Sequence, residues 1–139
     1  MVPFGDAAES MMSDEMGTFR TTIEIENPSR RGLRRALDDV LVDTGAELSW
    51  VPAPVLESLR IARDKPLRFR QANGEILDRW TGVALVYAGG TWTVDHVVFG
   101  EPDDLTLLGA RTLEGLNLRV DPVLKRLVDA GPAPAAAVA

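Results

Sequence analysis

Cysteine is absent from this sequence, and histidine occurs once, at His96. Without cysteine the chain has no disulfide scaffold, no thiolate zinc site and no cysteine nucleophile. A single histidine excludes a histidine-rich metal centre, and a Ser-His-Asp triad would have to use that one ring. We expect no metal and no cofactor, so the remaining possibilities are carboxylate chemistry, a binding module, or both.

The sequence also lacks an excess of positive charge and a long apolar run. It has 15 Lys and Arg against 21 Asp and Glu, a formal net charge of −6. This acidic balance disfavours binding to nucleic acid or to anionic membranes. No stretch approaches the roughly 20 apolar residues that span a bilayer, and the N-terminus lacks a basic-then-apolar signal pattern. We expect a cytoplasmic protein with neither nucleic acid nor membrane as a partner.

The length of 139 residues suits one domain, because single hydrophobic cores commonly occupy roughly 100–150 residues. Residues 1–16 mix small, acidic and Met residues without a period and predict a flexible leader. Residues 130–139 are mostly Gly, Pro, Ala and Val and predict a disordered tail. The folded domain is therefore predicted to span residues 17–129.

The pattern between these ends is mostly that of β-strands. Residues 18–26 alternate between apolar and polar side chains, with Ile23 and Ile25 on one face and Glu24 and Glu26 on the other. A period of two residues is typical of a half-buried strand.

Further strands and a helix are predicted downstream. The basic residues 30–35 follow a break at Asn27-Pro28-Ser29 and predict a solvated loop or a hairpin end. Apolar runs at residues 40–42 and 48–51 predict two strands. Prolines then precede a short helix predicted over residues 55–59.

Two hairpins follow in the sequence. Residues 66–71 and 76–86 flank Asn73-Gly74, which predicts a type I′ turn with both central residues at positive φ. Gly89-Gly90 predicts the turn of a second hairpin, whose outgoing strand covers residues 91–99.

The last part of the chain predicts smaller elements. A short helix is expected over residues 110–114, ended by Gly115. Two short apolar segments follow, at residues 118–120 and 124–128. The sequence as a whole predicts a mainly β, mainly antiparallel domain with one or two short helices.

Asp43 is the residue that most strongly suggests chemistry. It directly follows the apolar run Val40-Leu41-Val42, where burial is expected to be deep and a charge needs a reason. Gly45 permits a tight turn whose backbone N–H groups approach the carboxylate, and the Thr44 hydroxyl can donate or accept nearby. An ordinary Asx-type turn has the same three-residue pattern.

The context of this turn extends over most of the chain. The apolar triplet and Asp43-Thr44-Gly45-Ala46 precede an apolar strand, a long hairpin, and then Leu107-Leu108-Gly109 with a short helix. The chain then continues with Val120-Asp121-Pro122 and Lys125-Arg126-Leu127-Val128. This arrangement, over about residues 18–128, resembles the retropepsin-like aspartic proteases, particularly small single-domain prokaryotic members. The resemblance implies a closed β-barrel-like fold, a catalytic acid in the Asp-Thr-Gly turn, and a hairpin that closes over the substrate as a flap.

Peptide hydrolysis by carboxylates needs two acids that share one proton: one deprotonates a water and the other protonates the scissile carbonyl. Like charges about 3 Å apart cannot both ionise, and aspartic proteases are the general example of such a pair. This sequence has one Asp-Thr-Gly and is too short for two such lobes. A symmetric homodimer is therefore expected, in which Asp43 meets the partner's Asp43.

The resemblance also implies roles for individual residues. Asp43 is the shared acid and base, Thr44 braces the two turns through its hydroxyl, and Gly45 contacts the substrate backbone, so these three form the catalytic group. The flap covers about residues 70–77 and binds an extended peptide by strand addition. The residues expected to bind substrate are Ala46, Glu47, Trp50, Ala72, Asn73, Gly74, Glu75 and Leu108.

The sequence departs from the viral members at two positions. Glu47 stands where they often have Asp, and Ala110 stands where they often have Arg. Glu47 with Arg111 is a possible substitute for the ion pair of the viral enzymes. The expected function is an aspartic endopeptidase, a hydrolase acting on peptide or protein substrates. The alternative is a catalytically silent dimeric β module that binds extended peptides or a protein partner.

Overall fold

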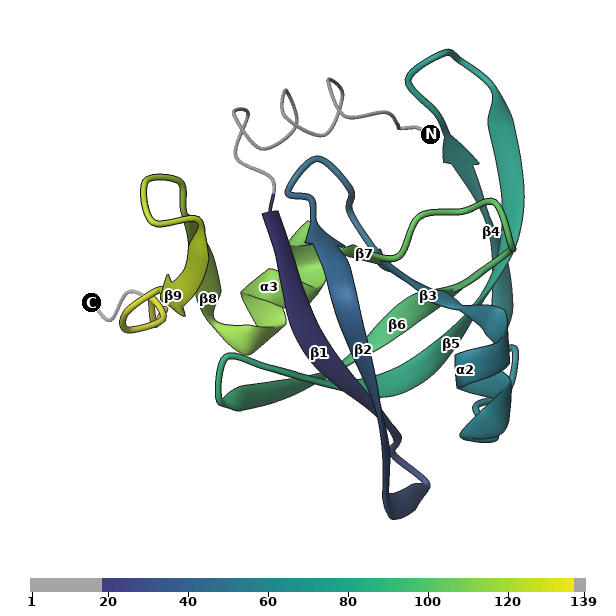
Figure 1. Ribbon diagram of the computed structural model, residues 1–139, viewed down its shortest axis with the longest axis horizontal. Helices are drawn as coiled ribbons and strands as arrows, with labels where there is room; N and C mark the ends of the chain where they lie inside the picture. The colour runs from purple at the N-terminus through teal and green to yellow at the C-terminus, as the bar shows by residue number, and fades with distance from the viewer. Residues whose placement is uncertain (1–18, 137–139) are drawn as a thin grey trace.

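The protein is mainly β, as the sequence predicts (Figure 1). The computed structural model describes residues 19–136, so the predicted leader, residues 1–16, and the last three residues of the predicted tail lie outside it. The strands within residues 19–136 are β1 (Phe19–Asn27), β2 (Arg30–Val42), β3 (Ser49–Pro52), β4 (Lys65–Arg70), β5 (Ile76–Ala88), β6 (Thr91–Gly100), β7 (Leu107–Leu108), β8 (Leu118–Asp121) and β9 (Arg126–Asp129).

The same part of the chain contains two short helices, α2 (Ala53–Ser58) and α3 (Ala110–Leu116). The first begins two residues earlier than the sequence predicts, with a proline in its first turn. Neither helix within residues 19–136 is long and apolar enough to cross a membrane.

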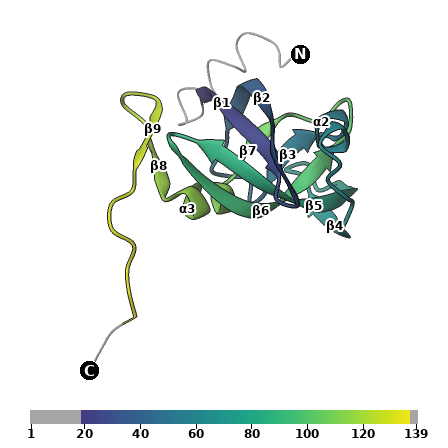
Figure 2. The same cartoon turned by 90° about the horizontal axis from the view of Figure 1, so that it is seen from below.

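Seven strands form one sheet in the order β1-β2-β7-β3-β6-β5-β4, and β1 also pairs with β5. Most pairings are antiparallel, as predicted, but β2 with β7 and β3 with β6 are parallel. Because β1 is hydrogen-bonded to both β2 and β5, the sheet folds back on itself around the core (Figures 1 and 2).

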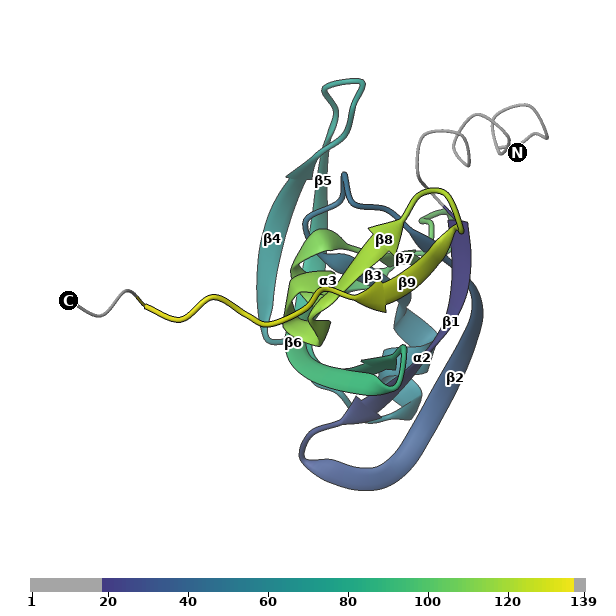
Figure 3. The same ribbon diagram turned by 90° about the vertical axis from the view of Figure 1, so that its left-hand side faces the viewer.

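The last two strands, β8 and β9, form a separate two-stranded sheet to one side of the larger one (Figure 3). Residues 130–136 then run away from it without regular structure (Figure 2).

The alternation predicted for the first strand is confirmed on its apolar face. Ile23 and Ile25 are buried with Val40 and Val42 of β2, and Leu56 of α2 packs in the same core. This continuous cluster of branched side chains supplies the apolar burial that stabilises the fold.

The basic residues 30–35 were predicted to be a loop or a hairpin end, and most of that prediction is wrong. They begin β2, because the turn from β1 is only Pro28-Ser29 long. Their side chains are exposed, as predicted, and they face acids across the strand pair: Arg34 lies 3.1 Å from Glu24. Cross-strand charge pairs of this kind favour continued pairing.

The turn between β4 and β5 also differs from the prediction. Gly74 has φ of 89°, but Asn73 is not among the positive-φ residues, so the turn is not type I′. The Gly74 N–H donates to the Gln71 carbonyl at 2.9 Å, and the Gln71 N–H donates to the Glu75 carbonyl at 2.8 Å. The longer connection therefore closes with one left-handed glycine. Gly89-Gly90 forms the turn of the second hairpin, as predicted, and both of its residues have positive φ.

Gly115 does not end the second helix, contrary to the prediction. The helix continues to Leu116 and ends at Asn117, which adopts the left-handed conformation with φ of 56°. A Cβ at Gly115 would collide with the side chain of Thr93 on β6. This glycine is therefore required by packing of α3 on the sheet rather than by a cap.

Glu26 is buried, although the alternation places it on the polar face of β1. Its carboxylate accepts hydrogen bonds from the Tyr87 hydroxyl and from the Gly32 N–H, and Arg31 Nε lies 3.2 Å away. The hydrogen bond from Tyr87 and that from Gly32 hold the pKa of Glu26 below its ordinary value of 4.5 against the opposing effect of burial. The carboxylate thus connects β1, β2 and β5 where the sheet folds back.

Because the pKa of Glu26 is lowered by folding, its stabilising contribution exists above about pH 4.5 and disappears as pH falls through the folded-state value. We expect Glu26→Gln to lower the free energy of unfolding at neutral pH, and the difference from the unsubstituted protein to shrink in acid. Urea unfolding at neutral and acidic pH measures this. Glu24→Gln, at an exposed ion pair, is the control and should change little; equal losses at both positions would contradict the assignment.

Candidate active site

Asp43 lies at the first turn after β2, on a support formed by β7. Its N–H donates to the Leu108 carbonyl at 3.0 Å, next to the parallel pairing of Val42 with Leu108. The turn closes with a hydrogen bond from the Ala46 N–H to the Asp43 carbonyl at 3.1 Å. Deep burial, which the sequence suggested for Asp43, ends one residue earlier at Val42, and Asp43 itself is half-buried.

The carboxylate of Asp43 is oriented by the turn. Its Oδ1 accepts a hydrogen bond from the Gly45 N–H at 2.9 Å. A Cβ at Gly45 would lie 3.2 Å from the same oxygen, so a larger residue would crowd the carboxylate. Within residues 19–136 no cation forms an ion pair with Asp43, which leaves it available to exchange a proton with a ligand or water.

Gly109 allows the segment after β7 to lie directly behind this turn. A Cβ there would lie 2.5 Å from the Leu48 carbonyl oxygen and 2.9 Å from that of Ala46. The next residue, Ala110, donates its N–H to the same Ala46 carbonyl at 2.8 Å. The glycine that follows the apolar pair is therefore needed for close backbone contact.

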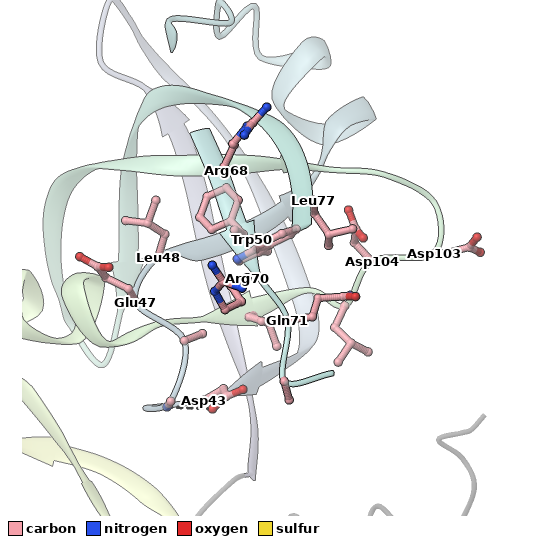
Figure 4. A pocket seen from close by; sticks show the side chains of 16 residues that line it. Asp43, Glu47, Leu48, Trp50, Arg68, Arg70, Gln71, Leu77, Asp103 and Asp104 are labelled. Carbon is pink, nitrogen blue, oxygen red and sulfur yellow. Dashed lines mark hydrogen bonds between the residues drawn. The ribbon is translucent and has the colours of Figure 1, made fainter. Parts of the chain in front are cut away.

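A pocket of about 690 Å³ opens beside Asp43, between the turn and the β4–β5 hairpin (Figure 4). Six of the residues singled out in the sequence line it. These are Asp43, Gly45, Ala46, Glu47, Trp50 and Ala72.

The other predicted site residues lie nearby but do not line this pocket. Thr44 is exposed in the turn, and Asn73, Gly74 and Glu75 lie at the exposed tip of the β4–β5 hairpin. Leu108 is fully buried, and it contacts the turn through its carbonyl, which accepts the Asp43 N–H.

The pocket also includes residues that were not named individually as substrate-binding. Arg70, Gln71 and Leu77 lie within the predicted flap, residues 70–77, and Leu107 belongs to the Leu107-Leu108-Gly109 segment. Phe69 could have been found, because it is the direct partner of Leu77 on the other strand of the predicted hairpin. The 101–106 loop carried no local signal. The complete set of additional lining residues is Leu48, Arg68, Phe69, Arg70, Gln71, Leu77, Asp103, Asp104, Leu105 and Leu107.

An aromatic pair forms part of the pocket wall. The rings of Trp50 on β3 and Phe69 on β4 are 5.0 Å apart between centroids and inclined by 59°. Tilted ring pairs at this distance are favourable beyond the area they bury. This wall suits a large apolar side chain of a ligand.

An ion pair between Arg79 and Asp104 fixes another part of the pocket wall. Arg79 donates from Nε to Asp104 Oδ2 at 2.7 Å and from Nη2 to Asp104 Oδ1 at 2.9 Å, with only 12% and 11% of the two side chains exposed. Burial by itself would raise the pKa of Asp104, but hydrogen bonds from Arg79 and from the Glu101 N–H outweigh it and lower that pKa. The pair ties β5 to the 101–106 loop, and the Arg79 guanidinium lies 5.9 Å from the Trp50 ring centroid.

The ion pair suggested for Glu47 and Arg111 is confirmed. Arg111 Nη2 lies 2.9 Å from Glu47 Oε2, and the Arg111 N–H donates to the Glu47 carbonyl at 2.9 Å. The two side chains are 50% and 75% exposed, so the ion pair itself contributes roughly 0–1 kcal/mol. Among residues 19–136 no group of three or more His, Cys, Asp or Glu is placed to hold a metal ion.

Comparison with known proteins finds similar solved structures, but neither a family model nor a curated protein. No family model matches the chain, and no curated protein matches it at a significant level. Among solved structures, the chain is similar to the solution structure of Simian Foamy Virus (mac) protease, with a TM-score of 0.47 and 18% sequence identity. The match covers 69% of this chain and 92% of that chain. A likeness of this size assigns neither a family nor an activity, so the functional assignment depends on the site itself.

We expect Arg79→Met to destabilise the protein by roughly 2–3 kcal/mol, because it leaves the mostly buried Asp104 carboxylate without its partner. The matched control is Arg111→Met at the exposed pair, which should cost no more than about 1 kcal/mol. Urea unfolding of both variants checks the difference. An equal loss of stability for the two substitutions would show that the mostly buried ion pair contributes no more than the exposed one.

Proposed function

We propose that this protein is an aspartic endopeptidase with a retropepsin-like fold, in which the seven-stranded sheet closed by β1 and β5 is a barrel and residues 17–129 form the domain. One observation carries the proposal above all others. Asp43 presents a carboxylate that is oriented by the Gly45 N–H, lacks an ion pair within the described residues, and lines a pocket large enough for a peptide side chain.

The second acid comes from another copy of the chain. Two other carboxylates that line the pocket already have partners, since Asp104 is bound by Arg79 and Glu47 by Arg111. Asp103 projects from the opposite side of the pocket, away from Asp43 (Figure 4). A two-fold axis beside the exposed turn brings Asp43 to the partner's Asp43 without any further sequence.

In this dimer the pair of carboxylates shares one proton and holds a water. The ionised member accepts a proton from the water, whose oxygen attacks the peptide carbonyl carbon, while the protonated member donates its proton to the carbonyl oxygen. The tetrahedral diol then breaks down: the carboxyl that took the proton from water donates it to the amine nitrogen, the C–N bond is cleaved, and the other carboxylate accepts a hydroxyl proton of the diol. A carboxylic acid and an amine are released, and the pair again shares one proton. Thr44, exposed beside the acid, braces the two turns against each other.

An extended peptide lies between the Asp43 turn and the β4–β5 hairpin, which acts as the flap. The tip residues Asn73, Gly74 and Glu75 move over it together with Ala72, and main-chain hydrogen bonds supply affinity. The wall formed by Trp50 and its aromatic neighbour accepts a large apolar side chain of the substrate.

The sheet of β8 and β9 provides a contact surface for the second copy. In Figures 1 and 3 the tip of this hairpin, the Asp43 turn and the tip of the β4–β5 hairpin reach the same side of the molecule. The hairpin tip exposes Val123 and Leu124 by 85% and 56%, and the outer edges of β8 and β9 have no partner strand within residues 19–136. A two-stranded sheet gains stability when more strands or a partner cover it.

Asp43→Asn tests the proposed acid directly. The amide keeps an oxygen that can accept the Gly45 N–H but cannot exchange the catalytic proton, so peptide cleavage should fall by at least about a thousandfold. Cleavage of a peptide library is measured at acidic and neutral pH. The control is Asp38→Asn, the same substitution at an exposed aspartate of β2, which should leave cleavage unchanged.

Undiminished cleavage by Asp43→Asn would overturn the assignment. Peptide binding without cleavage by the unsubstituted protein at any pH, and without stabilisation by a statine-type transition-state mimic, would instead identify a silent peptide-binding module.

Leu124→Asp tests the contact surface. A charge at this exposed tip should raise the dimer dissociation constant by at least about tenfold and lower the specific activity at low protein concentration, because the shared site is lost with the dimer. The control is Leu33→Asp, similarly exposed at 61% but on β2 close to the β1–β2 turn, which lies at the far end from the β8–β9 hairpin tip (Figure 1). Analytical ultracentrifugation measures the solution mass of both variants. If Leu124→Asp sediments as the same dimer as the unsubstituted protein, the β8–β9 hairpin is not the dimer contact surface.

A further inference from the structure

A network of three side chains, two of them fully buried, lies next to the Asp43 turn and outside the pocket lining. Ser49 on β3 and Thr112 on α3 are both 0% exposed, and their hydroxyl oxygens are 2.6 Å apart. Thr112 Oγ1 also lies 3.1 Å from Asp95 Oδ2 on β6. We call Ser49, Thr112 and Asp95 the hydroxyl network; it joins three elements that are far apart in the sequence.

The direction of its hydrogen bonds follows from the number of protons available. A carboxylate can only accept, so the single hydroxyl proton of Thr112 is donated to Asp95. The proton between Ser49 and Thr112 must then belong to Ser49. The Ser49 oxygen is left free to accept, and the Gly109 N–H donates to it at 2.9 Å. Hydrogen bonds in series polarise one another, so the charge of Asp95 strengthens the bond to Gly109.

Gly109 connects this network to the candidate catalytic acid. The residue before it, Leu108, accepts the Asp43 N–H, and the residue after it, Ala110, donates to the Ala46 carbonyl. A Cβ at Gly109 would collide with the carbonyls of the turn, so the backbone there is in direct contact with it. Any shift of the Gly109 peptide therefore moves the support on which the Asp43 turn rests.

We propose that Ser49, Thr112 and Asp95 are positioning residues for Asp43. The network fixes the position of the Gly109 N–H and thereby the position and orientation of the Asp43 carboxylate, although none of the three side chains lines the pocket. The catalytic consequence rests on the proposed function, because two carboxylates can share a proton only when their separation is tightly controlled.

The test compares Thr112→Val, which keeps the shape but removes the hydroxyl, with Thr112→Ser, which keeps the hydroxyl. For Thr112→Val we expect kcat to fall about tenfold with KM within about twofold, and the pH profile of kcat/KM to shift. Thr112→Ser should restore both. The amide of Gly109 should exchange its hydrogen about tenfold faster in Thr112→Val, measured by NMR.

Thr81→Val is the matched control. Thr81 is also fully buried, and its hydroxyl donates to the Lys65 carbonyl at 2.8 Å, away from the Asp43 turn. It should lose stability to urea by a similar amount, yet keep the pH profile and the Gly109 exchange rate. Equal changes in Thr81→Val and Thr112→Val, or unchanged exchange at Gly109 in Thr112→Val, would overturn the positioning role.

The two proposals can fail separately. If the unsubstituted protein cleaves no peptide, the endopeptidase assignment fails, while hydrogen exchange at Gly109 and Asp43 still decides whether the network holds the turn.

Discussion

The candidate site depends on the hydrogen bond from the Asp43 N–H to the Leu108 carbonyl. It forms because β2 and β7 run parallel, and because Gly109 has no Cβ to separate the following backbone from the carbonyls of Ala46 and Leu48. Two segments far apart in the sequence are thereby held back to back. With any side chain at position 109 the two would separate, and Asp43 would lie on an unsupported surface turn.

Two of the acids that line the pocket are paired with arginines, whereas Asp43 has no ion pair within residues 19–136. Asp104 is neutralised by Arg79 in a mostly buried pair, and Glu47 by Arg111 in an exposed one. These pairs also hold the walls, since the first ties the 101–106 loop to β5 and the second ties the turn to α3. Asp43 is instead oriented by a backbone N–H, which leaves its carboxylate free for proton exchange with water or a ligand.

Local patterns predicted those parts of the fold whose cause is local. Gly89-Gly90 adopts the predicted turn because two adjacent glycines tolerate positive φ without help from the rest of the protein. Asn73 was assigned the same conformation wrongly, because the connection there is longer and needs only one left-handed residue. The predictions for Gly115 and Glu26 were wrong for a different reason, because contacts between distant elements decide both. Gly115 lies inside α3, where packing against β6 requires a glycine. Glu26 is buried because groups on β2 and β5 donate hydrogen bonds to its carboxylate.

The sequence alone determined the strand pattern, the acid in a glycine-containing turn and the hairpin beside it, because period, turn chemistry and a charge after an apolar run are properties of neighbouring residues. Only the tertiary structure decided that Arg79 meets Asp104 at one wall of the pocket, and that the Ser49 hydroxyl meets that of Thr112 behind the turn. These contacts depend on strand order and on two parallel pairings between distant segments. No short window of sequence contains both partners, so no local pattern can specify them.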